Sequence, residues 1–173
     1  MNAKKLTYMG LLLAVGIVLP QVFHFAGPQS GAIFLPMHIP VLIAGFVLGP
    51  IYGLALGLLL PLVSSVLTGM PAIIRLPFMI GELMAYGYFS GLIYKLTKGK
   101  SWSCILSLLS AMILGRIVYG LMLMIATYLL NMNVGGLAAV MVAISTGIPG
   151  IIIQLILIPL LVYALERKGV IHE

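Results

Sequence analysis

The chain has 173 residues, of which 62% are hydrophobic and 7% are charged, with nine Lys and Arg against three Asp and Glu. Together with a mean hydropathy of +1.25, this composition indicates an integral membrane protein and leaves no segment for a soluble domain. The net charge of +6 therefore reports orientation in a membrane, not nucleic-acid binding.

Six membrane-spanning helices are predicted, which makes the whole chain, residues 1–173, one all-α bundle. In chain order their approximate ranges are 6–25, 37–48, 51–67, 76–96, 102–130 and 137–165. The first segment resembles a signal peptide, but no Ala-x-Ala-like site follows, so we expect a retained helix. The second segment is short and contains Pro40 and Gly45. The second and third segments could therefore also form a re-entrant pair.

Seven of the nine Lys and Arg residues fall on one side of this six-helix arrangement, whereas Arg75 lies at a segment boundary and Arg116 inside an apolar segment. The seven lie at the two ends of the chain and between the fourth and fifth segments: Lys4, Lys5, Lys95, Lys98, Lys100, Arg167 and Lys168. The connections expected at 24–36, 68–71 and 131–136 contain no Lys or Arg. Because basic residues remain on the cytoplasmic side, both termini are predicted to be cytoplasmic.

Polar side chains inside the apolar segments are the candidate functional residues, because a charge at the centre of a membrane helix costs roughly 2.5–3.5 kcal/mol on insertion scales. Their predicted positions gather in the outer half of the bundle: His38, Arg75, Glu82, Tyr86, Arg116, Tyr119 and Gln154. This distribution favours a small polar ligand captured from outside. Each residue also has a simpler interpretation. Glu82 and Arg116 could be only an interhelical ion pair, Arg75 an interfacial anchor, His38 a cap and Gln154 an interhelical hydrogen bond.

Common catalytic motifs are missing from the sequence. There is no Gly-x-x-x-x-Gly-Lys-Ser/Thr loop, no His-Glu-x-x-His pair and no Gly-x-Ser-x-Gly turn. The single Cys104 excludes an internal disulfide, and we expect neither a metal nor a cofactor. Two alternatives remain open: a proton-coupled carrier that works alone with Glu82 as its titrating group, and a small membrane-embedded enzyme or assembly factor.

Small residues recur at helical spacing in two segments. Gly53 and Gly57 form a Gly-x-x-x-Gly pair, which is interpreted mainly as internal packing. Gly10 and Ala14 form a similar pair in the first segment. Such faces let helices approach closely in lipid.

Several motifs resemble the substrate-binding S components of energy-coupling factor (ECF) vitamin transporters. They are FLPMHIPVLIAGFVLGP at 34–50, GLALG at 53–57, LTGMP at 67–71 and GELMAYG at 81–87. The resemblance implies a non-enzymatic subunit of a bacterial-type plasma membrane. Such a subunit captures a water-soluble vitamin for ATP-driven uptake and works with a transmembrane T component and two cytoplasmic ATPases. In the family, a small-residue face of the first helix, usually Ala-x-x-x-Ala, docks on the T component. Here that position reads Gly10 to Ala14, with Gly in place of the first Ala.

The resemblance also implies where the substrate binds, with the connection between the first two helices covering it. The region maps onto His24, Gln29, His38, Arg75, Glu82, Tyr86, Arg116, Tyr119, Asn131, Asn133 and Gln154. Pantothenate would place its carboxylate on Arg75 or Arg116. A pyridine or pyrimidine vitamin would instead set a ring nitrogen against Glu82 and stack on Tyr86 or Tyr119. The combination of MHIP and GELMAYG favours pantothenate.

Overall fold

The computed structural model describes residues 3–25, 27, 29–100 and 102–167, so Lys168 of the basic set lies outside the described residues. All regular elements in this part are helical. They are α1 (Ala3–His24), α2 (Ser30–Phe34), α3 (His38–Leu48), α4 (Pro50–Thr68), α5 (Leu76–Thr97), α6 (Ser103–Met124), the π-helix η1 (Ile125–Leu129) and α7 (Gly136–Arg167). They make six spans, because α2 continues into α3 and α6 into η1. The predicted six-span fold is confirmed.

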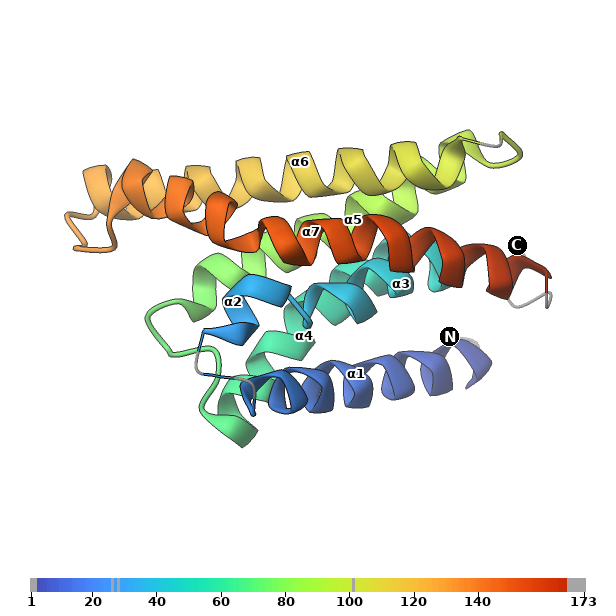
Figure 1. Cartoon of the computed structure of the whole chain (residues 1–173), viewed down its shortest axis with the longest axis horizontal. Coiled ribbons are helices and arrows are strands. Elements are labelled where there is room, and N and C mark those ends of the chain that lie inside the picture. The colour runs from blue at the N-terminus through green and yellow to red at the C-terminus, as the bar shows by residue number, and fades with distance from the viewer. Residues whose placement is uncertain (1–2, 26, 28, 101, 168–173) are drawn as a thin grey trace.

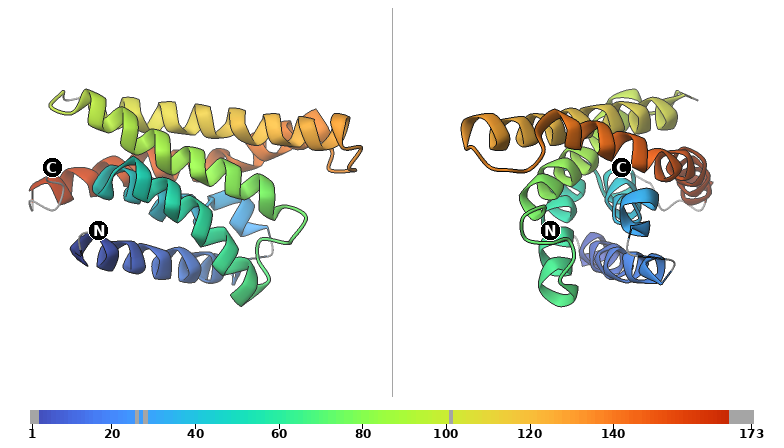
Figure 2. Two further views of the ribbon diagram at one scale, coloured as in Figure 1. Left: turned by 180° about the vertical axis from the view of Figure 1, so that it is seen from behind. Right: turned by 60° about the vertical axis from the view of Figure 1, so that its left-hand side comes forward.

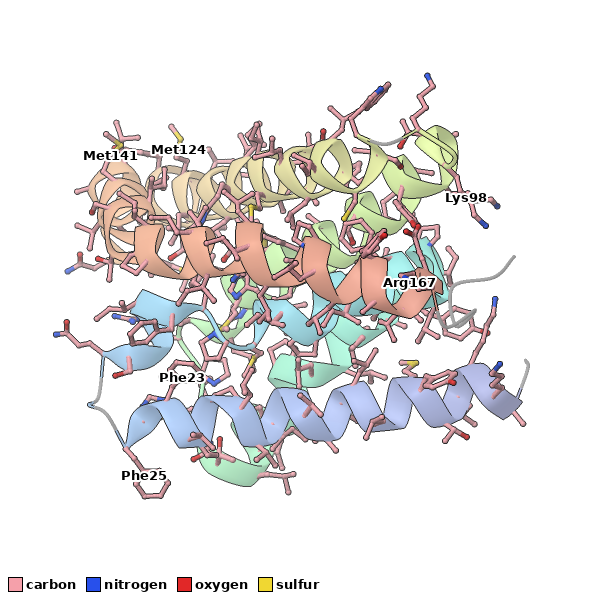
Figure 3. The ribbon with its side chains drawn as sticks, turned by 45° about the vertical axis from the view of Figure 1, so that its right-hand side comes forward. Phe23, Phe25, Lys98, Met124, Met141 and Arg167 are labelled. Atoms are coloured by element: carbon pink, nitrogen blue, oxygen red, sulfur yellow. The ribbon has the colours of Figure 1, made fainter. Side chains whose placement is uncertain are left out.

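The start of α1 and the end of α7 lie at the same end of the bundle (Figure 1). Figure 3 places Lys98 and Arg167 at that end, and Phe25, Met124 and Met141 at the opposite end. Segregation of the basic residues to one end agrees with the predicted cytoplasmic termini. The opposite end is therefore the outer one.

The centre of the bundle is α3, in which nine of eleven residues are buried. It packs against α4 and α5, and these three helices approach through glycines. A methyl group on Gly53 would overlap the carbonyl group of Gly87, and one on Gly57 would lie 2.5 Å from the Leu83 carbonyl carbon. The glycines of α4 thus serve internal packing, as predicted. Contacts of this closeness supply the van der Waals attraction that holds helices together in lipid.

The outer helices enclose this centre unevenly. α5 packs on α6, α6 on α7, and α7 returns to cover α2 and α3. By contrast, α1 lies at one side of the bundle against α3 and α4 and apart from α6 (Figures 1 and 2). Only 11% of the membrane-spanning window of α1 is buried, against 67% for the span Ser30–Leu48.

The sequence prediction is wrong about the connection after α1, because it treated 24–36 as an outer loop without a helix. The structure has the short helix α2 there, ended by Leu35 in the left-handed conformation at φ 50°. Two contacts stabilise α2: the Phe34 ring packs at a tilt of 39° against Phe23, with ring centroids 5.1 Å apart, and the backbone of α2 lies close to Gly150 of α7. Because both partners lie outside this stretch, its own Gly and Pro content did not indicate the helix.

The fifth predicted segment, 102–130, is also not one uniform α-helix. It changes into η1 near its outer end. There the Thr127 hydroxyl accepts a hydrogen bond of 3.1 Å from the backbone N–H of Gly136, at the start of α7. The last segment is a single helix of 32 residues despite Pro149 and Pro159.

Candidate functional site

The most prominent polar feature inside the bundle is a cluster formed by His38, Glu82, Tyr86, Arg116 and Gln154, here called the polar cluster. Arg116 Nη1 lies 3.0 Å from Glu82 Oε1, with the two side chains 13% and 5% exposed. His38 Nε2 lies 3.7 Å from the same carboxylate oxygen. Helices α3, α5 and α6 therefore each contribute one ionisable side chain to a single point.

Local geometry explains why α5 supplies two members of the polar cluster. Glu82 and Tyr86 are four residues apart, so they lie on one face of the helix, one turn apart. The Tyr86 side chain is fully buried, and its ring meets the His38 ring edge-on at 4.9 Å between centroids. A methyl group on Gly115 of α6 would overlap the Tyr86 ring. Gly115 therefore lets α6 approach closely enough for Arg116 to reach Glu82.

The polar cluster is covered by the link between α2 and α3. Leu35 is 8% exposed, and its carbonyl accepts a hydrogen bond of 3.2 Å from Gln154 Nε2 of α7. A methyl group on Gly147 would lie 3.0 Å from Arg116 Nη2 and 3.1 Å from Leu35 Cδ1. Because Gly147 has no side chain, Arg116 Nη2 and the side chain of Leu35 can both lie against it.

Several buried polar atoms of the cluster have no hydrogen-bond partner among the described residues. They are Nδ1 and Nε2 of His38, Nε and Nη2 of Arg116, Oε1 of Gln154, the Tyr86 hydroxyl, and Oε1 of Glu82, which Arg116 approaches as an ion pair. The Tyr86 hydroxyl lies beside the Arg116 guanidinium without forming a regular hydrogen bond. A buried polar atom without a partner costs about 1–3 kcal/mol, so this concentration makes the polar cluster the candidate binding site.

The other predicted site residues surround the polar cluster rather than join it. Tyr119 is half-buried on α6, and the charges of Glu82, Arg116 and Arg75 are near enough to act on its hydroxyl. Arg75 itself is exposed, directly before α5. The half-buried His24, at the end of α1, lies 3.5 Å from the position of a methyl group on Gly31.

The remaining predicted residues lie in exposed positions at connections. Gln29 precedes α2. Asn131 and Asn133 lie in the link between η1 and α7, where Asn131 adopts a positive φ of 53°. Their contribution to a ligand site remains a prediction.

Sequence reasoning missed two members of the enclosure, Leu35 and Gly147. Both are nonpolar and carry no signal of their own, because their role is to occupy or leave space beside Arg116. Gln21 of α1 was also missed, although a polar residue within an apolar segment is a signal. Its buried Nε2 lacks a partner among the described residues.

A second long-range polar contact lies at the cytoplasmic end. The Tyr94 hydroxyl of α5 donates a hydrogen bond to the Glu166 carboxylate of α7. It joins the two helices near the end marked by Arg167 in Figure 3.

The outward face of α1 carries the small-residue pair predicted for partner docking. Gly10 and Ala14 are exposed, and no atom lies within 4 Å of a methyl group placed on Gly10. A shallow hollow runs further along this face, lined by Ala14, Val15, Val18, Leu19 and Val22. The buried side of α1 lies elsewhere, at Gly16 and Pro20.

Comparison with protein-family models matches residues 4–162 to the substrate-specific component of ECF transporters. Neither the curated proteins nor the solved structures gave a match. Members of this family are multi-pass plasma-membrane proteins, and they form a family of transporter components rather than of enzymes. They bind small-molecule substrates and work with a T component and ATPases. Since the match covers nearly the whole chain, this protein belongs to the family of ECF transporter substrate-specific components.

Proposed function

We propose that this subunit captures a carboxylate-bearing, water-soluble vitamin at the polar cluster, and that pantothenate is the substrate. The observation that carries the proposal is the unpaired edge of a buried arginine. Arg116 uses Nη1 for Glu82, while its Nε and Nη2 atoms have no partner among the described residues.

The free edge of Arg116 has the geometry that a carboxylate requires. Nε–H and Nη2–H point in parallel and can bind both oxygens of one carboxylate, which adds orientation to the charge attraction. Because Arg116 is only 13% exposed, little water competes for these donors. An arginine with one edge held by Glu82 and the other free is therefore preorganised for an anion.

Other atoms of the polar cluster suit the uncharged part of such a molecule. His38 Nδ1 and Gln154 Oε1 are buried without partners among the described residues and differ in hydrogen-bonding character. Gln154 accepts through Oε1, and an imidazole nitrogen donates or accepts according to its tautomer. Pantothenate offers hydroxyl and amide groups of both kinds beside its carboxylate.

A pyridine or pyrimidine vitamin is the less favoured candidate. It would need an open aromatic face for stacking, and the fully buried Tyr86 ring is enclosed by His38 and by the α6 backbone at Gly115. Only the half-buried Tyr119 remains for stacking. Glu82, the expected partner for a ring nitrogen, is already engaged by Arg116.

Docking of the T component is proposed for the face of α1 that carries Gly10 and Ala14. At about 100° per residue, Ala14 is turned roughly 200° from the buried Gly16, so the small pair points away from the bundle. The open space around Gly10 supports close approach of another helix at this position.

Calorimetric titration of the detergent-purified chain tests the substrate. Pantothenate should bind, and the analogue with a primary alcohol in place of its carboxylate should lose about 1.5–3 kcal/mol, the range for a hydrogen bond to a charged group. Arg116→Gln should cause a similar loss, while the matched Arg75→Gln change should have a smaller effect. A native mass spectrum of the purified chain checks the same point, because a retained molecule should carry a carboxylate.

Equal affinity for the acid and the alcohol would contradict a carboxylate site. A larger loss from Arg75→Gln than from Arg116→Gln would move the site to the outer start of α5.

A further inference from the structure

The ligand-free polar cluster is electrically balanced. Glu82 contributes one negative charge and Arg116 one positive charge, and they form an ion pair at 3.0 Å. His38, 2% exposed, is the third ionisable side chain at this point and needs no charge to complete the balance. A substrate that brings its own charge would disturb this arrangement.

Among the described residues, the other helices offer no further counter-ion inside the bundle, and Arg75 lies exposed before α5. Of the groups that face His38, Glu82 and Tyr86 come from α5, and Arg116 comes from α6. The sequence of α4 contains no Asp, Glu, Lys, Arg or His, and the charged residues of α7 stand at its cytoplasmic end. On α1 the basic residues are Lys4, Lys5 and His24, near its two ends.

A carboxylate entering this site would therefore leave one uncompensated negative charge in a buried place. Burial of an unpaired charge is costly, and titratable groups respond by changing protonation. The free edge of Arg116 can hold the substrate carboxylate, but then two carboxylates share one guanidinium. A second positive charge restores the balance.

We propose that substrate binding takes up one proton from solvent, that the His38 imidazole receives it, and that the resulting imidazolium pairs with Glu82. This inference rests on the proposed carboxylate substrate. The bound site then contains two ion pairs, Arg116 with the substrate and His38 with Glu82. No other chemical change accompanies the step.

Geometry and ordinary acid–base behaviour both favour His38 over Glu82 as the acceptor. Nε2 of His38 already lies 3.7 Å from Oε1 of Glu82, so a small movement gives a charge-assisted hydrogen bond. Both imidazole nitrogens are buried without partners among the described residues, and an imidazolium donates from both. Histidine is also the side chain whose charge ordinarily changes between pH 5 and 8.

Titration of the purified chain with pantothenate, in two buffers of different ionisation enthalpy, counts the protons. Near pH 7.5 the difference in heat should correspond to about one proton taken up per substrate bound. Because the bound state holds the extra proton, affinity should strengthen as pH falls, by up to about tenfold per pH unit. A buffer-independent heat would overturn the inference while leaving the carboxylate site intact. No heat and no binding of pantothenate would reject the proposed substrate and the inference together.

Two substitutions assign the proton. His38→Gln should bind pantothenate more weakly, with no proton uptake and no pH dependence, and His38→Asn checks the result if the first variant folds poorly. His172→Gln makes the same change at a histidine outside the proposed site, so the proton count should stay at one. Proton uptake that survives in both His38 variants, or that disappears in His172→Gln, would overturn the assignment.

Discussion

At the scale of single residues, the energetics of the site depend on two buried charges. Glu82 lies on α5 and Arg116 on α6, and Arg116 Nη1 is 3.0 Å from Glu82 Oε1. Burying each charge in a membrane costs free energy, and this cost is offset only if each has a counter-charge. Even with this pairing, nitrogen atoms of Arg116 and His38 have no hydrogen-bond partner among the described residues.

Removing one charge of this pair should therefore destabilise the ligand-free protein. Glu82→Gln and Arg116→Gln should each lower the melting temperature in detergent, because breaking a buried ion pair costs roughly 3–5 kcal/mol at most. The double variant should recover part of the loss, with a coupling of about 0.5–3 kcal/mol. Strictly additive losses would show that the two side chains do not stabilise one another.

At the scale of elements, glycines decide how closely the helices approach. Gly53 of α4 lies against the Gly87 backbone of α5. A methyl group placed on Gly150 of α7 would lie 2.6 Å from the Phe34 carbonyl carbon of α2. Backbone atoms cannot move aside as a flexible side chain does. Close packing at these points positions α5 and α7 around the polar cluster and holds the covering link in place.

A methyl group at Gly53 should consequently separate α4 from α5. We expect Gly53→Ala to destabilise the chain by at least about 1–3 kcal/mol, the usual cost of overpacking. The matched control is Gly10→Ala, where nothing lies within 4 Å of the added group. Alanine lowers the conformational entropy of the unfolded chain relative to glycine, so Gly10→Ala should leave the melting temperature unchanged or raise it slightly. Equal melting of the two variants would refute the packing argument.

At the scale of the whole molecule, burial is distributed unevenly. The span Ser30–Leu48 is enclosed by other helices, while α1 exposes most of its surface at one side of the bundle. Apolar exposure is ordinary in lipid, but open space around a glycine is suited to a helical partner. The polar cluster and the outward face of α1 are thus separate, and substitutions should separate binding from transport.

Bulky side chains on the face of α1 should block uptake without affecting substrate binding. In vesicles that contain the T component, the ATPases and ATP, Gly10→Leu with Ala14→Leu should abolish accumulation while calorimetric affinity and melting stay unchanged. Ala138→Leu, at an exposed position of α7, is the matched control. Loss of substrate binding in the α1 variant would instead place the pair in internal packing.

Vesicles that contain only this subunit test the energy source. Under an imposed proton gradient they should not accumulate substrate, because members of this family work with a T component and ATPases. Accumulation there would favour the proton-coupled carrier.

The amino-acid sequence alone was enough to predict the membrane class, the six spans, the orientation and the resemblance to the family that the comparison then established. These properties follow from local quantities, namely the transfer free energy of each segment and the side on which basic residues remain. The sequence also indicated that Glu82 and Arg116 face the interior, since lipid does not tolerate isolated charges.

The contacts among the polar residues became visible only in the folded structure. His38 and Glu82 are 44 positions apart, and Gln154 reaches Leu35 across 119 positions, so their contact depends on how α3, α5, α6 and α7 cross. Glycine contacts set those crossings, and neither composition nor periodicity encodes their angles. For the same reason α2, stabilised by Phe23 and Gly150, could not be predicted from its own Gly- and Pro-containing stretch.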